Sequence, residues 1–284
     1  NQTIFLVRRF GYRYFLLYSP SIRKVDYLRV DQQFMKEIRP MSGISMVRLG
    51  DGFDGGYVLP KSAINICDSL ISLGYGYESS FERHFLKLNR NKSVALYDLD
   101  INLISSVSKL FEDFKLMLRN YRPVHYKRLF DLLRVLLNPR IKYKIGRIGN
   151  IHDPDCLNLI DVFESDAGQK VILKMDIEGS EYESLSLDLN ILYKCQLLIV
   201  EFHDIDSRIE QFLATIKRIR TEFTLVNTHI NNNGPVIKGI PSVIELCFMR
   251  SSMLTEEMLT PAYSIPHSDD RPCNPSKAEF VYRY

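Results

Sequence analysis

Residues 171–181 read VILKMDIEGSE, a mostly apolar run that ends in three carboxylates and a glycine. A short apolar run bounded by a glycine-containing turn predicts a strand that is buried on both faces of a parallel sheet. We expect this strand at Val171–Met175, with Asp176 directly after it and a helix opening near Ser180. The turn therefore carries acidic side chains at the carboxyl end of a buried strand, where ligands bind in open parallel sheets.

The same alternation of short apolar runs and helical periodicity extends in both directions from this stretch. Helices between most of the strands indicate right-handed crossovers and a parallel sheet, whereas the last two strands have none between them and should pair antiparallel. The fold class is therefore α/β, with seven strands. The expected strands are 70–73, 93–97, 142–148, 171–175, 197–201, 223–226 and 243–248. The expected helices include 81–88, 103–119, 156–163 and 209–219.

The chain divides into a short first segment and one large domain. Residues 1–40 form a basic, aromatic N-terminal segment, and residues 41–284 form the domain that contains the sheet. Within that domain we expect a basic helical insertion at about 115–140. The tail, 251–284, has regularly spaced prolines, which favour an extended path over the surface.

The net charge of +3 is unevenly distributed along the chain. Residues 1–30 carry six basic side chains and one acidic one, and residues 115–149 carry ten and one. Such basic segments favour an anionic membrane surface or an acidic glycan as partner. Residues 121–137 have the pattern of a basic amphipathic helix, which could serve either purpose or act as a lid whose leucines join the core. No nucleic acid is expected, because no recognised binding module accompanies the charge.

The composition is that of a globular protein, with 284 residues, 45% hydrophobic and 25% charged. No run approaches 18 apolar residues, so the sequence predicts no membrane-spanning helix. Five widely spaced cysteines without a C-x-x-C pair argue against a disulfide framework and against a structural zinc site. We expect a cytoplasmic protein, or one peripheral to a membrane. Because the chain starts at Asn1 without methionine, an upstream anchor and a Golgi or secretory lumen remain an alternative.

A glycine turn after the first strand is a candidate nucleotide-binding loop. The turn Gly74-Tyr75-Gly76 lies between a strand and a helix, although Ser79 stands where a third glycine would complete the motif. Asp98 closes the second strand and could accept hydrogen bonds from a ribose diol, or could cap a helix. Asp98 and Asp100 also spell D-x-D, the pattern with which glycosyltransferases hold a metal ion and a nucleotide sugar.

Two further strands end in acids that we expect to share one pocket. Asp176 follows the fourth strand and Glu201 ends the fifth, with His203 two residues later. Neighbouring strands lie about 4.8 Å apart, so these side chains can face each other at the sheet edge. The alternative is a set of helix caps and surface acids. Acids at the ends of two successive buried strands favour a functional site.

At these residues the chain resembles the FkbM-type family of S-adenosylmethionine-dependent O-methyltransferases. The resemblance covers most of residues 48–250 and implies a Rossmann-like class I methyltransferase sheet, with helices on both faces and an antiparallel last strand. The matching stretches are LKMDIEGSE (173–181), IVEFH (199–203), Arg48-Leu49-Gly50, 54–59, ISLGYGYESSFE (71–82) and PSVIELCFMR (241–250).

The resemblance also implies roles in binding the cofactor. The turn Gly74-Tyr75-Gly76 would cradle its methionine part, Asp98 would hold its ribose, and Asp176 would lie beside the sulfonium. The segment with Arg48 and Gly55 would fold over the cofactor mouth. Ser72 stands where such enzymes usually carry an acid before the glycine loop, so Glu82 or Asp176 would have to neutralise the cofactor's amino group.

For the reaction, the resemblance implies methyl transfer to a carbohydrate hydroxyl. A hydroxyl is a weak nucleophile and needs a base or a metal ion. His203 and His229 are the candidate bases, since an imidazole titrates near neutral pH. Alternatively Asp176, Glu201 and His203 would hold a divalent cation, magnesium or manganese. A glycosyltransferase and a non-catalytic methyltransferase-like module are the two other hypotheses.

Overall fold

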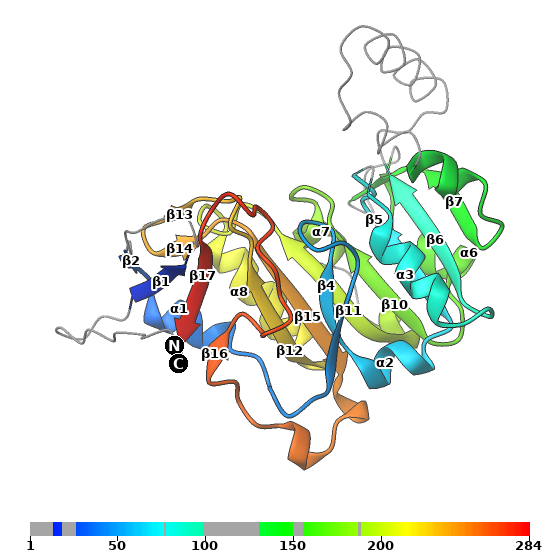
Figure 1. Ribbon diagram of the computed structural model, residues 1–284. Coiled ribbons are helices and arrows are strands. Elements are labelled where there is room, and N and C mark those ends of the chain that lie inside the picture. Colours follow the sequence, from blue (N-terminus) through cyan, green and yellow to red (C-terminus); the bar gives the residue numbers. More distant parts are fainter. Residues whose placement is uncertain (1–13, 19–26, 77, 99–130, 150–155, 187–188) are drawn as a thin grey trace, which may run out of the picture.

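The computed structural model describes the chain apart from residues 1–13, 19–26, 77, 99–130, 150–155 and 187–188 (Figure 1). Within the described residues the main element is a seven-stranded sheet of order β12-β15-β11-β10-β5-β6-β7. Its strands are β5 (Ser69–Leu73), β6 (Ser93–Asp98), β7 (Ile141–Ile145), β10 (Val171–Met175), β11 (Cys195–Phe202), β12 (Phe223–Ile230) and β15 (Ile244–Arg250).

The direction of each strand confirms the expected topology. β5 pairs in parallel with β10 and β6, and the parallel pairing continues to β11 on one side and to β7 on the other. β15 is antiparallel to both of its neighbours, β11 and β12. The last strand is reached through a loop and not a crossover helix, so it must run in the reverse direction. This is the Rossmann-like class I methyltransferase sheet.

Helices cover both faces of the sheet, as expected. All residues of β5 and β10 are buried, which explains why their sequences are nearly continuous apolar runs. One hydrophobic cluster joins the sheet to α1, α6 and α8, and the other joins it to α2 and α3. The helices are α1 (Gln32–Glu37), α2 (Lys61–Ile66), α3 (Ser80–Leu88), α6 (Leu159–Asp166), α7 (Glu181–Ser184) and α8 (Ile209–Ile219).

The boundaries between the third strand and the next helix differ from those expected. β7 ends at Ile145, and β8 (Arg147–Ile148) pairs with β9 (Cys156–Leu157) in a separate small sheet. The helix begins only after Asn158, whose side chain accepts hydrogen bonds from two backbone N–H groups of the first turn. Apolar periodicity could not locate the first residue of this helix, because the cap at Asn158 sets it and the apolar pattern does not.

The basic insertion falls mostly outside the described residues. The helix expected at 103–119 lies there entirely, as does most of 115–140. Residues 131–136 are helical, with Leu132 and Val135 buried. Leu137, by contrast, is 79% exposed, so the leucines of this segment divide between core and surface.

The tail is an integral part of the fold, and parts of it are paired in a sheet and buried. β16 (Ser264–Ile265) and β17 (Glu279–Arg283) form a four-stranded sheet with β1 (Tyr14–Tyr18) and β2 (Tyr27–Arg29), in the order β16-β17-β1-β2. Along β17 the buried residues alternate, so Phe280 and Tyr282 face inward. Ile265 and Cys273 are also buried. Proline spacing did not reveal this strand, which starts after the last proline.

A hairpin precedes the sheet and lies against it. β3 (Met46–Leu49) pairs with β4 (Tyr57–Pro60), and β4 packs on β12 and β15 (Figure 1). This packing places the connecting loop, residues 50–56, beside the carboxyl ends of the parallel strands. Among the described residues, no helix is both long enough and apolar enough to cross a membrane.

Candidate active site

Four neighbouring strands bring their polar ends to one edge of the sheet. In the order β6, β5, β10, β11 these ends carry Asp98, the turn after Leu73, Asp176 and His203. Since parallel strands end at the same edge, side chains far apart in the sequence meet there. The edge is therefore the candidate active site, as the sequence predicts.

The turn after β5 requires glycine for two different reasons. Gly74 has φ +85°, and a Cβ there would lie 1.7 Å from the carbonyl oxygen of Asp176. The turns after β5 and β10 therefore touch through their backbones, which a side chain would prevent. Gly76 has φ +55°, and among the described residues no atom lies within 4 Å of the position of its Cβ. The backbone at Gly76 is consequently open to a ligand.

Asp98 holds the glycine turn in place. Its Oδ2 accepts hydrogen bonds from the backbone N–H of Tyr75, at 2.7 Å, and of Gly76, at 3.3 Å. Tyr75 contributes through its backbone here, because its ring is buried and its hydroxyl donates to Asp131. Burial, together with Asp131, raises the pKa of this hydroxyl. The other aspartate of the D-x-D pattern, Asp100, lies outside the described residues.

A carboxyl group from α3 occupies the position of the acid that is missing before the glycine turn. Ser72 Oγ donates to Glu82 Oε1 at 2.6 Å. The second oxygen, Oε2, is buried and has no hydrogen-bond partner among the described residues. Burial raises the pKa of Glu82, although Lys174 and Ser72 oppose the shift. Oε2 of Glu82 is thus an exception among the described residues, because a buried polar atom without a hydrogen-bond partner is rare.

Arg48 stabilises the loop between β3 and β4. Its Nε donates to the carbonyl of Asp51 and its Nη2 to that of Phe53. The loop then reaches the start of α3, where the backbone N–H of Gly50 donates to His84 Nδ1. A Cβ on Gly55 would lie 2.9 Å from the side chain of Glu78, just after the glycine turn. The loop thus lies against the glycine turn, and Arg48 stabilises the loop through hydrogen bonds to the loop's own carbonyl groups.

His203 lies among four carboxylates. Its Nδ1 is 3.1 Å from Oε1 of Glu181, which is fully buried. Its Nε2 faces three further carboxylate oxygens, none of them within 3.5 Å. These belong to Glu178 at 3.6 Å, Asp176 at 3.9 Å and Glu201 at 3.9 Å.

The carboxylates determine the protonation of this cluster. Burial alone would lower the pKa of His203, but Glu181, Glu201 and Asp176 raise it to about 9. Burial and the charges of Asp176 and Glu245 raise the pKa of Glu201 well above its ordinary value. Before any ligand binds, His203 is therefore a cation at neutral pH and not a ready base.

A polar row crosses the sheet at this level. Met175 pairs with Val200, so Asp176 and Glu201 follow side by side, and Glu201 is directly opposite Glu245 on β15. Glu245 is in turn opposite His229 on β12. Directly opposed residues of neighbouring strands share one face of the sheet. The sequence predicted the first two members of this row, but the strand order was needed to find Glu245.

His229 lies at the far end of this row, away from the cluster around His203. It is 1% exposed, with Nδ1 2.9 Å from Glu245 Oε2 and Nε2 3.4 Å from Glu279 Oε2. Both ring nitrogens therefore face carboxylates of the protein itself. This position does not favour the predicted role of a base that acts on an acceptor.

Besides Glu245 and Glu178, three further site residues were missed in the sequence. Lys174 donates to the carbonyl of Gly74 and lies 3.8 Å from Asp176, and it was detectable as the one cation within an apolar strand. Glu181 accepts hydrogen bonds from the backbone N–H groups of Ile177 and Gly179, which fixes the turn. The same carboxylate also holds the ring of His203. Asn231 donates to Glu201 at 2.7 Å, and no local pattern announces it.

The grouping that could hold a metal ion differs from the predicted one by one residue. Ligand atoms of Asp176, Glu178 and His203 all lie within 4.8 Å of one another. Glu178 takes the place of the predicted Glu201, which lies beside the group and is bound by Asn231. Glu178 adopts φ +53°, an uncommon conformation for a residue other than glycine, and its side chain is 87% exposed.

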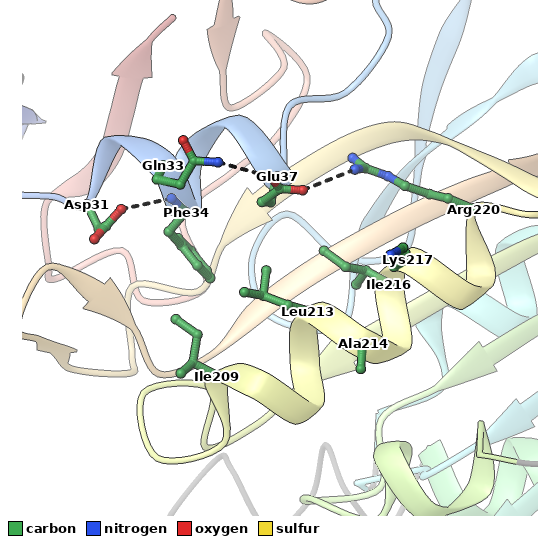
Figure 2. A pocket seen from close by; sticks show the side chains of 10 residues that line it. All are labelled: Asp31, Gln33, Phe34, Glu37, Ile209, Leu213, Ala214, Ile216, Lys217 and Arg220. Carbon is green, nitrogen blue, oxygen red and sulfur yellow. Dashed lines mark hydrogen bonds and ion pairs between the residues drawn. The ribbon is translucent and has the colours of Figure 1, made fainter.

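A sizeable groove lies away from this edge. Figure 2 shows this groove of about 490 Å³ between α1 and α8, with Phe34 and Leu213 in its lining and a Glu37–Arg220 ion pair at 3.9 Å. Its lining brings together no nucleophile or metal-ligating cluster. A smaller cavity of about 390 Å³ lies beside the ends of β6 and β7, where Tyr97 and Lys144 line it. Of these two cavities, the smaller one adjoins the polar edge.

Comparison with known proteins supports the fold and identifies a family. The sequence profile of the methyltransferase FkbM domain matches residues 71–233, more than half of the chain. This match runs from β5 to just beyond β12 and includes every strand end described above except the start of β15. No curated protein sequence matches the chain significantly.

Solved structures resemble the chain only distantly. Spermidine synthase from Thermotoga maritima has 12% identity and a TM-score of 0.37, covering 89% of this chain and 86% of its own. A protein of the NADB-Rossmann superfamily from Streptococcus agalactiae has 13% identity and a TM-score of 0.35, covering 70% and 72%. A putative caffeoyl-CoA O-methyltransferase from Staphylococcus aureus has 9% identity and a TM-score of 0.34, covering 66% and 78%.

Proposed function

The chain belongs to the FkbM methyltransferase family, and on this premise we propose that it transfers a methyl group from S-adenosylmethionine to a carbohydrate hydroxyl. The observation that carries the proposal is the meeting of an open glycine turn with the carboxylates around His203 at one strand edge. The turn offers a place for the cofactor, and the carboxylates offer a place for the acceptor.

The residues at the edge fit this cofactor. Bound S-adenosylmethionine supplies an electrophilic methyl carbon on a sulfonium, and it carries a second cation, its amino group. Gly76 leaves its backbone accessible, and the buried Oε2 of Glu82 has no hydrogen-bond partner in the part of the chain that the structure describes. We assign Glu82 to the amino group, because a cation at this position would stabilise the charged carboxylate. Asp98, held by the turn, is assigned to the ribose diol.

Alignment is the main catalytic contribution of the chain. Methyl transfer is an in-line displacement, so the acceptor oxygen must be held opposite the leaving sulfur. Asp176 adjoins both the glycine turn and His203, which makes it the residue that joins the two half-sites. The loop with Gly55 lies against the glycine turn and would cover the cofactor mouth.

Activation of the hydroxyl is assigned to the group Asp176, Glu178 and His203. Three carboxylate oxygens surround Nε2 at 3.6–3.9 Å while Glu181 holds Nδ1 from behind. A histidine that is oriented by a carboxylate on its other nitrogen is common in metal sites. Magnesium or manganese held there would polarise the acceptor hydroxyl. The alternative is His203 acting alone as general base, which its high pKa allows only at alkaline pH.

The acceptor class rests on the family resemblance and on the loop. Phe53 belongs to the loop that lies against the glycine turn, and its side chain is 49% exposed, so an apolar ring is accessible in this loop. The face of such a ring suits the apolar side of a sugar. Binding to an anionic membrane or an acidic glycan through the basic segments remains part of the proposal.

The experiment is a binding and transfer assay with three arms. Calorimetry with S-adenosylhomocysteine should show binding, whereas nucleotide sugars should not bind; the reverse would favour the glycosyltransferase hypothesis. Labelled S-adenosylmethionine should transfer label to a glycan or glycolipid panel. Binding without transfer to any hydroxyl acceptor would favour a non-catalytic module.

The metal is tested in the same assay. With a metal, excess chelator should abolish transfer, and magnesium or manganese should restore it. Glu178→Gln should then lose activity but bind S-adenosylhomocysteine normally, while Glu210→Gln, a control at an exposed position of α8, should retain both. Full activity in excess chelator, with a rate that falls below about pH 9, would establish His203 as the base.

A further inference from the structure

We propose that His229, Glu245 and Cys273 form a second metal site, for zinc or a similar transition ion, which binds the C-terminal tail to the sheet. The three residues come from β12, β15 and the tail, and their ligand atoms lie within 4.8 Å of one another. All three are buried. The site is separate from the proposed catalytic group and does not depend on the proposed function.

The distances are close to those of a bound ion. Glu245 lies between the other two residues, with Oε2 2.9 Å from His229 Nδ1 and Oε1 3.3 Å from Cys273 Sγ. Around tetrahedral zinc, with bonds of about 2.0–2.3 Å, neighbouring ligand atoms are about 3.3–3.6 Å apart. Small rotations of these side chains would therefore open the space that an ion needs.

The chemistry of the ligands selects the metal. Nitrogen, oxygen and sulfur donors together suit zinc and similar ions, whereas magnesium and calcium prefer oxygen alone. Three protein ligands leave a fourth position for water or for a further carboxylate. The proposed catalytic group has two carboxylates and one histidine and no thiol, so the two sites would take different metals.

Glu279 supplies the second observation. Its Oε2 lies 3.4 Å from His229 Nε2, the ring nitrogen that faces away from Glu245. Histidine ligands usually donate their other N–H to a carboxylate, which fixes the tautomer and the orientation of the ring. Glu279 is thus placed to keep Nδ1 free for the ion.

The charges balance when an ion binds. Burial lowers the pKa of His229 but the charge of Glu245 raises it overall, and burial raises the pKa of the Cys273 thiol, so both groups favour their protonated forms when no ion is bound. Binding one divalent cation would release one proton from His229 and one from Cys273. Two positive charges replace two protons, so the net charge of this buried cluster stays the same. The exchange avoids the cost of adding charge to the interior.

The site would connect the tail to the active edge. Glu245 lies opposite Glu201 in the polar row, and Glu201 lies beside His203. Cys273 and Glu279 come from the tail, and among the described residues no disulfide joins the tail to the sheet. An ion here would hold both the tail and Glu245 in place.

The test measures metal content directly. The full chain, purified reduced and without chelator, is saturated with zinc, desalted and analysed by elemental mass spectrometry. We expect one zinc per chain, and at least a tenfold loss of affinity in Cys273→Ser and in His229→Gln. Cys195→Ser removes a buried thiol outside the site and should retain zinc, as should Glu178→Gln in the catalytic group. Glu279→Gln should weaken zinc binding about 10–100-fold.

Cobalt provides a check that needs no variant. Cobalt(II) bound by Cys273 should give a near-ultraviolet thiolate-to-metal band in the wild-type chain, and zinc should displace it. The proposal is overturned if the saturated wild type retains no zinc and gives no such band. It is equally overturned if Cys273→Ser retains zinc as tightly as the wild type. Either result would leave the proposed cofactor site at the glycine turn untouched.

Discussion

The two ends of the polar row surround a histidine with carboxylates in opposite ways. At one end, Nε2 of His203 faces three carboxylates, none within 3.5 Å, and the side chain is 14% exposed. At the other end, His229 is buried, and both of its nitrogens face carboxylates at 3.4 Å or less. The loose arrangement leaves space for a reacting ligand, whereas the tight one holds parts of the protein together. Packing, more than residue type, separates catalysis from stability here.

The largest effect should follow from changing the loose end. His203→Gln removes the imidazole that either binds the metal or accepts the proton. We expect transfer to fall about 10²–10⁴-fold, the usual contribution of such a group. The affinity for S-adenosylhomocysteine should stay within about twofold, since His203 serves the acceptor and not the cofactor. If His203→Gln turned over nearly as fast as the wild type, the end of the row around His203 would not be the catalytic one.

The tight end should affect stability instead. In chelator-treated protein, His229→Gln leaves Glu245 and Glu279 without their buried cation. Breaking a buried pair in this way costs about 3–5 kcal/mol of unfolding free energy, measured by urea denaturation. Lys217→Gln, which removes an exposed cation from α8, is the control and should change stability by less than about 1 kcal/mol. An unfolding free energy of His229→Gln equal to that of the wild type would contradict the structural role.

A smaller effect is expected for the cofactor half-site. Asp98→Ala removes the acceptor for the backbone N–H groups of Tyr75 and Gly76 as well as the proposed contact to the ribose. The affinity for S-adenosylhomocysteine should fall by about 1.5–3 kcal/mol in calorimetry. Glu210→Ala, which removes an exposed carboxylate from α8, provides the matched control. An affinity unchanged from the wild type would remove Asp98 from the site.

The smallest effect concerns pH. The pKa of His203 is raised from an ordinary 6.5 to about 9, so the protonated form stabilises the fold. This stabilisation is fully present below about pH 6.5 and is lost as the pH rises toward about 9. In chelator, the stability difference between wild type and His203→Gln should therefore shrink across this range, by on the order of 2 kcal/mol. A difference that grows with pH would show that the carboxylates do not act on His203 as described.

Several features of the fold and the site followed from local pattern. α8 was predicted at its observed bounds because its apolar residues recur at helical spacing on one buried face. The strand at Val171–Met175 was found because burial on both faces leaves a nearly continuous apolar run. Asp176 and Glu201 were placed together because parallel strands share one edge. These features depend only on the period of the backbone and on the direction of the strands.

Other features depend on contacts that no local pattern records. The sequence argued against a structural metal site because its cysteines are widely spaced, yet Cys273 meets His229 and Glu245 in the folded chain. The spacing of the prolines predicted that the tail runs extended over the surface, whereas Phe280 and Tyr282 in the tail are buried. In both cases the partner comes from a strand that is distant in the sequence. Spacing along the chain says nothing about such pairs.

The sequence by itself determined the seven strands, the antiparallel last strand and the acids that end two of them, because periodicity and crossover length are properties of the chain. Only the tertiary structure decided which acids meet which histidine. Glu181 and Asn231 join the first cluster, and Glu279 joins the second, through the order and register of neighbouring elements. The side-chain period tells which face a residue occupies, whereas its neighbours across the sheet depend on how distant strands assemble.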